Sequence, residues 1–177
     1  MRTRIAVMSA VVLLTSALAT ARAGQTRASP HETVSGGVRG AELSITYGRP
    51  YMRGRVIMGA LVPYGRVWCP GADEATTLTT TKPLKMGDLT LAAGRYTLWM
   101  LPTSDAWTLV VSKQTGQWHT QYDPAQDLGR VELRKRALTV PVEQLTFAIG
   151  KDRSRTGGAI TMTWETTEVS VPFTVVQ

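Results

Sequence analysis

The chain of 177 residues contains one cysteine and two histidines. A single cysteine, Cys69, excludes an internal disulfide, so the fold must be held together by its core. Cys69 is then a small buried residue, a free thiol, a metal ligand or a link to another molecule. The closely spaced ligand pairs typical of zinc and copper sites are missing around Cys69, His31 and His119. We therefore expect no metal and no bound cofactor.

The sequence also lacks the short motifs that identify common reactions. It has no G-x-S-x-G, H-E-x-x-H or C-x-x-C pattern and no glycine-rich phosphate loop. Sustained helical periodicity, internal repeats and low-complexity linkers are missing as well, which favours one domain. Without a catalytic signature, a protein that is not an enzyme is the favoured hypothesis.

The N-terminal residues have the pattern of a cleavable signal peptide. Arg2 and Arg4 form a positively charged start, residues 5–19 are apolar without a charge, and residues 21–23 read Ala-Arg-Ala. The apolar stretch is shorter than the roughly 20 residues of a membrane-spanning helix. We predict a signal peptide over residues 1–23 and a periplasmic or secreted protein, with no membrane span after cleavage.

The predicted mature chain, residues 24–177, suits a single domain. Loss of three arginines with the signal peptide lowers the formal net charge from +7 to +4, because 17 basic residues then face 13 acidic ones. A mild positive charge favours encounters with anionic polymers of the cell envelope. Nucleic acid is not an expected partner, because an exported protein seldom meets it.

Alternation of apolar and polar residues with a period of two runs through most of the mature chain, interrupted by glycine-containing turns. This pattern predicts an all-β fold: a single antiparallel β-sandwich, jelly-roll-like or immunoglobulin-like, of roughly eight to ten strands. Trp99 falls on the strand face opposite to Tyr96. The expected core-facing residues are Leu43, Ile45, Tyr47, Tyr96, Leu98, Met100, Trp107, Leu109, Val111, Leu145, Phe147, Ile149, Ile160, Met162, Trp164, Val169, Val171 and Phe173.

Three further positions carry local predictions. The turn at Gly94 returns the chain into a strand, where the hydroxyl of Tyr96 is expected to reach a nearby backbone group, as in tyrosine corners. Pro172 cannot donate to a sheet ladder, so we expect the last strand at an edge. The best candidate for a turn of helix is residues 55–61.

The segment 61–78, LVPYGRVWCPGADEATTL, combines Trp68 with the adjacent acids Asp73 and Glu74. Neighbours on an extended chain point to opposite faces, so these two acids do not form a matched acid/base pair by themselves. We expect one of them to form a clamp with an arginine of the preceding segment, which would pin two loops together. The candidates are Arg49, Arg53 and Arg55.

A second segment, TGQWHTQYDPAQDLGR at residues 115–130, gathers aromatic and titratable side chains. They are Trp118, His119, Tyr122, Asp123 and Asp127. At the mouth of a sandwich such residues can supply a stacking floor with an acid and a base. In the alternative interpretation the segment is a long loop, in which Asp123 starts a turn and Asp127 caps a backbone group.

Five segments carry a family resemblance: ITYGRP, RGRVIMGALVPYGRVWCPGADEATTL, LAAGRYTLWMLP, AWTLVVSKQTGQWHTQYDPAQDLGRV and MTWETTEVSVPF. In this order, over residues 29–173, they resemble domain-of-unknown-function family 2911, a family of exported bacterial proteins. The resemblance implies an exported, mostly β domain and names no reaction or substrate.

In the family pattern, the stretch after the Tyr-Gly corner reads Val-Trp-Arg-x-Gly-Ala-Asn-Glu-Ala-Thr. The chain matches it at Val67, Trp68, Gly71, Ala72, Glu74, Ala75 and Thr76. Cys69 stands where arginine is usual, so the resemblance argues against a thiol nucleophile or metal ligand that the whole family requires at this position. Asp73 stands where asparagine is usual, which implies that this position acts by hydrogen bonding. His119 stands where glycine is frequent, which weakens a catalytic role there.

Three hypotheses of function follow. The first is a non-catalytic module that binds a small molecule or an envelope polymer. The second is an envelope hydrolase of glycans or small molecules, which would use Glu74 with Asp123 or Asp127. The third is a purely structural domain. The candidate ligand-binding residues are Arg49, Arg55, Trp68, Asp73, Glu74, Trp118, His119, Tyr122, Asp123 and Asp127.

Overall fold

A computed structural model describes residues 27–152 and 156–177. The predicted signal peptide and its cleavage point lie outside these ranges. Within them, no helix has both the length and the apolar composition that crossing a membrane requires.

The described residues form nine strands and one short 3₁₀ helix, η1. Their bounds are β1 His31–Val38, β2 Ala41–Gly48, β3 Thr77–Thr80, β4 Leu84–Met86, β5 Leu89–Leu91, β6 Gly94–Pro102, β7 Trp107–Ser112, η1 Pro124–Gln126, β8 Asp127–Lys151 and β9 Gly157–Val175. The strands pair antiparallel in the order β1-β2-β3-β6-β7-β8-β9-β4-β5. The predicted all-β antiparallel fold is confirmed, and the number of strands lies within the predicted range.

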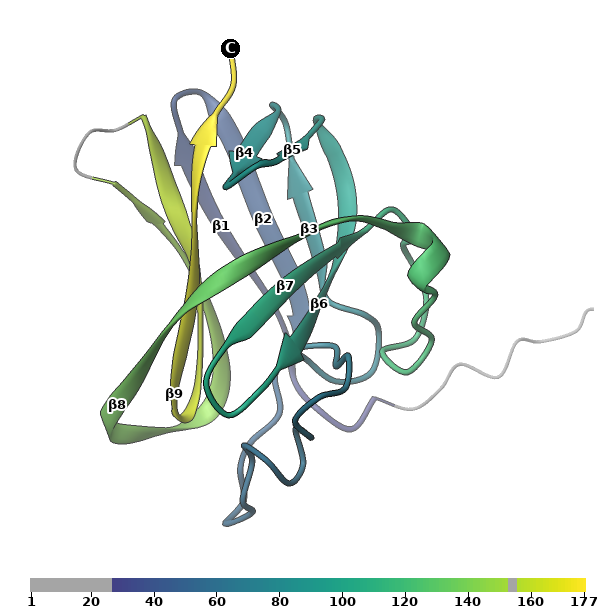
Figure 1. Ribbon diagram of the computed structural model, residues 1–177, viewed down its shortest axis with the longest axis vertical. Coiled ribbons are helices and arrows are strands. Elements are labelled where there is room, and N and C mark those ends of the chain that lie inside the picture. The colour runs from purple at the N-terminus through teal and green to yellow at the C-terminus, as the bar shows by residue number, and fades with distance from the viewer. Residues whose placement is uncertain (1–26, 153–155) are drawn as a thin grey trace, which may run out of the picture.

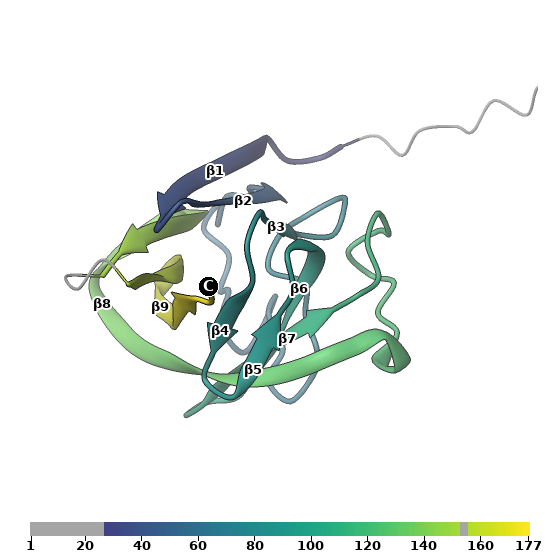
Figure 2. The same ribbon diagram turned by 90° about the horizontal axis from the view of Figure 1, so that it is seen from above.

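The long strand β8 joins the two parts of this open sheet. Its first part pairs with β7 up to Leu133, and the part from Arg134 onward pairs with β9. Register shifts in the second pairing mark irregularities of the kind that bend strands. As a result β8 sweeps around the molecule (Figures 1 and 2), and Tyr47 of β2 packs edge-on against Phe147 of β8. The folded sheet thus encloses a main core, which is compatible with a sandwich, and a smaller second cluster is formed by Cys69, Ala75, Trp99 and Val110.

Period-two alternation places the predicted residues in this core. All of them are buried except Ile149, which is half-buried against it. Full burial of a large apolar side chain contributes roughly 1.5–3 kcal/mol. A core of this extent accounts for a stable domain without a disulfide.

The local predictions had mixed outcomes. The Tyr96 hydroxyl donates to the Ala92 carbonyl at 3.0 Å, which confirms the tyrosine corner. The last strand, β9, is not at an edge, because β8 and β4 flank it. Within β9, pairing with β8 ends at Ser170 and pairing with β4 begins at Thr174. Pro172 lies between these two paired stretches, so its missing N–H is not needed for a ladder hydrogen bond. Residues 55–61 form turns rather than a helix.

The loops that connect β2 to β3 (residues 49–76) and β7 to β8 (residues 113–126) lie at the same end of the sheet (Figure 1). An isolated antiparallel bridge between Glu74 and Trp118 joins them. Residues 27–30, directly before β1, run past the same end, and Arg49 N donates to the Pro30 carbonyl at 2.7 Å. The topology therefore brings three distant segments together.

Candidate functional site

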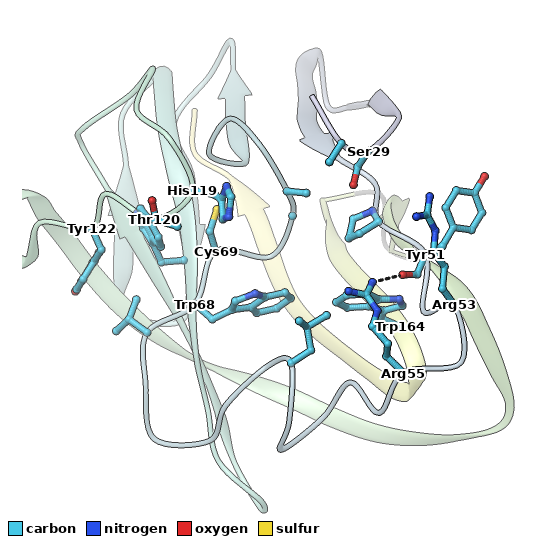
Figure 3. A pocket seen from close by; sticks show the side chains of 17 residues that line it. Ser29, Tyr51, Arg53, Arg55, Trp68, Cys69, His119, Thr120, Tyr122 and Trp164 are labelled. Carbon is cyan, nitrogen blue, oxygen red and sulfur yellow. Dashed lines mark hydrogen bonds between the residues drawn. The ribbon is translucent and has the colours of Figure 1, made fainter. Parts of the chain in front are cut away.

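A cavity of about 590 Å³ lies where these three segments meet the sheet (Figure 3). Its size falls within the roughly 300–1,000 Å³ of small-molecule sites. Of the described residues that line it, none is acidic. The aromatic side chains in the lining are Tyr51, Trp68, Trp99, Tyr122 and Trp164, and the basic or titratable nitrogen groups are Arg53, Arg55 and His119.

Trp68 and Trp164 form one wall of the cavity. Their rings stack with centroids 6.2 Å apart and an interplanar angle of 15°. Trp68 also packs edge-on against the buried Trp107, at 6.4 Å. The backbone of Trp68 exchanges two hydrogen bonds of 2.8 Å with Met100 of β6, which ties the loop to the sheet. This aromatic wall is therefore fixed before any ligand arrives.

Tyr122 and Trp99 form a second aromatic pair, with centroids 5.1 Å apart. The Tyr122 hydroxyl donates to Asp127 Oδ2 at 2.8 Å, and Arg130 Nη2 donates to that hydroxyl at 3.1 Å and to the carboxylate at 3.0 Å. Burial raises the pKa of Tyr122, and the hydrogen bond to Asp127 raises it further. The phenol is therefore protonated at neutral pH, and Asp127 serves to hold it.

The Glu74 carboxylate pairs with Arg27, which precedes β1. Arg27 donates from Nε at 3.0 Å and from Nη2 at 2.8 Å to Glu74 Oε1. Glu74 therefore pairs with an arginine as expected, but the prediction of its partner was wrong, because Arg27 precedes β1 and is not one of the three arginines proposed. Arg49 instead pairs with Glu32 at 2.7 Å, and Arg55 donates to the carbonyl oxygens of its own loop. The hydrogen bond from Arg27 lowers the pKa of Glu74.

Asp73 acts by hydrogen bonding, as the family pattern implied. Its carboxylate accepts from the backbone N–H groups of Ala28 at 3.1 Å and Ser29 at 3.2 Å, and lies 3.3 Å from His31 Nε2. Burial alone would raise the pKa of Asp73, but these hydrogen bonds outweigh it and the pKa is lowered. The φ angle of Asp73 is 67°, a conformation that aspartate and asparagine tolerate better than most residues.

The corner that carries these acids is tightly packed. A Cβ atom on Gly71 would lie 2.6 Å from Thr76 Oγ1, so only glycine fits. Thr76 Oγ1 in turn donates to the Pro70 carbonyl at 2.9 Å. Such packing fixes the direction in which Asp73 and Glu74 leave the corner.

His119 presents one ring nitrogen to the cavity. Its Nδ1 lies 2.7 Å from the Asp73 carbonyl oxygen, and its backbone N–H donates to the same oxygen at 2.9 Å. A carbonyl oxygen only accepts, so Nδ1 carries a proton, and in the neutral ring Nε2 is then an acceptor. His119 thus offers a fixed hydrogen-bonding group in the cavity lining.

Cys69 lines the cavity but is almost fully buried. Burial raises its pKa to about 12, so the thiol is neutral at physiological pH and is a poor nucleophile. Over the described ranges, no three His, Cys, Asp or Glu side chains are grouped closely enough to hold a metal ion.

The structure brings part of the predicted site residues into the lining: Arg55, Trp68, His119 and Tyr122. The others lie outside it: Arg49, Asp73, Glu74, Trp118, Asp123 and Asp127. Asp123 caps η1 by accepting from Ala125 N at 2.9 Å, in agreement with the turn interpretation. The other half of that interpretation was wrong, because the Asp127 carboxylate accepts from the side chains of Tyr122 and Arg130 instead of capping a backbone group.

Sequence reasoning missed the aromatic residues Trp99 and Trp164. Trp164 was expected only in the core, and it is indeed buried, but it lies at the end of the core that the cavity reaches. Trp99 could have been identified from the sequence, because it lies on the strand face opposite the core. A large aromatic side chain on that face needs a second apolar environment.

A family model described as "Protein of unknown function (DUF2911)" matches residues 29–173. The resemblance in the sequence is therefore confirmed. No curated protein and no solved structure matches the chain.

Proposed function

The chain belongs to this family of unknown function, and we propose that it is a non-catalytic binding module exported to the bacterial cell envelope. Its ligand is a small molecule with an apolar or aromatic body and an anionic group. Export is supported by the signal-peptide pattern of residues 1–23.

The observation that carries the proposal is the lining of the cavity. Two preformed aromatic pairs line it: the half-buried rings of Trp68 and Tyr122 are accessible to a ligand, and the buried rings of Trp164 and Trp99 pack against them. Aromatic contacts of this kind contribute about 0.5–1.5 kcal/mol beyond the burial of area. Arg53 and Arg55 are the charged side chains of the lining, so they favour an anionic group at the mouth.

The three carboxylates of the hydrolase hypothesis are engaged in structural contacts. Glu74 pairs with Arg27, Asp123 caps η1, and Asp127 holds Tyr122 together with Arg130. None of them lines the cavity. A purely structural role is disfavoured because a filled apolar junction, rather than a cavity of about 590 Å³, would serve it.

Binding can be tested with anilinonaphthalene sulfonate, a fluorescent probe that combines aromatic rings with an anionic group. We expect saturable binding by the mature protein at one site, with quenching of tryptophan fluorescence. Val67 lines the cavity, so Val67→Trp should fill part of it and weaken binding by roughly tenfold or more.

The matched control is Val140→Trp, which adds the same side chain at an exposed position of β8 that does not belong to the cavity lining. Melting curves of both variants establish that each is folded. Equal probe binding by a folded Val67→Trp variant and the Val140→Trp control would place the probe outside the cavity and refute the proposal.

A further inference from the structure

The part of the β2–β3 loop from Tyr51 to Arg66 exposes an unusual amount of apolar surface. Within the described residues, six large hydrophobic side chains are exposed, and four of them belong to this segment. They are Tyr51, Val56, Leu61 and Tyr64, with exposed fractions of 38%, 66%, 45% and 42%. This number of exposed apolar side chains within one short segment favours an interaction surface. We call these four side chains the apolar patch.

The apolar patch is held rigidly, because each exposed aliphatic residue precedes a buried one. Ile57 and Val62 are fully buried and anchor the loop in the core. Leu61 N donates to the Val56 carbonyl at 3.5 Å and Val62 N to the Ile57 carbonyl at 2.9 Å, so the two pairs lie side by side. The patch therefore exists before any partner binds.

Two more contacts fix the patch in place. The Glu165 carboxylate of β9 accepts hydrogen bonds from the backbone N–H groups of Ile57 and Met58, at 3.1 and 3.2 Å. The Tyr64 ring lies over Gly59, where an added Cβ would be 3.0 Å from the ring. The loop cannot bury its exposed side chains without breaking these contacts.

This segment, taken with the two residues on either side, is positively charged. Residues 49–68 contain four arginines and no acidic residue. Arg49 is paired with Glu32, while Arg53, Arg55 and Arg66 are exposed. The acids that contact the segment, Glu143 and Glu165, accept hydrogen bonds from its backbone at Arg53, Ile57 and Met58. An excess of positive charge thus surrounds the apolar patch.

We propose that this segment docks on an anionic lipid surface, with the apolar patch entering the headgroup region and the arginines contacting lipid phosphates. Aromatic and aliphatic side chains flanked by arginines fit such an interface. A second copy of the chain fits poorly, because a two-fold symmetric contact would bring the same arginines of both copies together. The proposal goes beyond ligand binding in the cavity, although Tyr51, Leu61, Arg53 and Arg55 also belong to the cavity lining.

The test is flotation of the mature protein with vesicles of phosphatidylcholine, alone or mixed with phosphatidylglycerol. We expect binding to the mixed vesicles that weakens as salt is added, and little binding to phosphatidylcholine alone. Val56→Asp should weaken binding by roughly tenfold, since it places a charge in the apolar patch. Arg66→Gln should weaken it about fivefold.

Matched controls separate this surface from general charge and hydrophobicity. Val140→Asp and Arg134→Gln make the same changes at exposed positions of β8, and neither should alter flotation by more than about twofold. Val56→Asp should leave probe binding in the cavity unchanged, because Val56 is not part of its lining.

Three results would overturn the proposal. They are absence of binding to mixed vesicles, equal losses for Val56→Asp and Val140→Asp, and a wild-type dimer in solution that Val56→Asp converts to a monomer. The last result would assign the apolar patch to a second copy of the chain.

Discussion

The cavity has two flanks that are attached to the sheet in different ways. On one flank, residues 51–66 are anchored by the fully buried side chains of Ile57 and Val62. On the other flank, residues 27–30 place no buried apolar side chain in the core and are held by Asp73 and Glu74 through hydrogen bonds and an ion pair. The burial of Ile57 and Val62 does not depend on charge, so the first attachment is less sensitive to pH and salt than the second, although Glu143 and Glu165 add hydrogen bonds to it. The second attachment depends largely on the carboxylates of Asp73 and Glu74.

This difference has a consequence for the cavity. Ala28 and Ser29 line it, so the polar attachment also holds one of its walls. A wall held by polar contacts, without a buried apolar side chain, opens at a lower free energy than one anchored in the core. We expect ligands to enter on the side of residues 27–30 while residues 51–66 stay in place.

The largest effect is expected from Ile57→Ala, which removes a buried anchor. Deletion of a buried isoleucine side chain to the β-carbon costs about 2–5 kcal/mol of the free energy of unfolding. Denaturant titration measures this loss. The matched control is Val56→Ala, because the neighbouring side chain is exposed, and we expect a change within about 0.5 kcal/mol. Similar losses for both variants would show that residues 51–66 are not anchored through Ile57.

An intermediate effect is expected from Asp73→Ala, which removes the acceptor of the Ala28 and Ser29 N–H groups. Loss of these hydrogen bonds, together with the strain of alanine at a positive φ angle, should cost about 2 kcal/mol. Asp73→Asn keeps an acceptor and tolerates the same backbone, so its cost should be about half. An equal cost for both substitutions would contradict a hydrogen-bonding role.

The same attachment predicts a dependence on pH. The pKa values of Asp73 and Glu74 are lowered in the folded state. Their contribution to stability is therefore complete above their unfolded pKa values of about 4 and is lost as the pH falls through the lower folded values. We expect the free-energy difference between wild type and Asp73→Asn to shrink in acid. A difference that stays constant below about pH 4 would assign it to packing.

The strands could be predicted from the sequence because their cause is local. The alternation of apolar and polar residues determines which face of a strand packs on the core, regardless of which strands lie beside it. Leu43, Ile45 and Tyr47 are buried accordingly. The order of the strands has no such local cause. Pro172 predicted an edge position for the last strand, yet β9 lies inside the sheet. It pairs with β8 before Pro172 and with β4 after it.

The site was predicted less completely for the same reason. Trp68, His119 and Tyr122 stand in conspicuous loops, and all three line the cavity. The partner of Glu74 lies 47 residues away in the N-terminal segment, and no periodicity or spacing relates the two. An arginine close in sequence was the natural expectation, but the topology brings Arg27 to the corner instead.

The smallest effect is expected from Glu74→Gln, although its ion pair with Arg27 is the most visible contact of the polar flank. The two side chains are 43% and 58% exposed, so water and salt screen their attraction. Exposed pairs of this kind contribute about 0.2–1 kcal/mol, far less than a buried clamp. We expect Glu74→Gln to lower the free energy of unfolding by less than about 1 kcal/mol, and less still at high salt. Arg136→Gln, which breaks the exposed pair with Glu168 on the sheet, is the matched comparison. A loss several times larger for Glu74→Gln than for Arg136→Gln would mean that the N-terminal residues depend on this pair, and that the polar flank is as firmly attached as the apolar one.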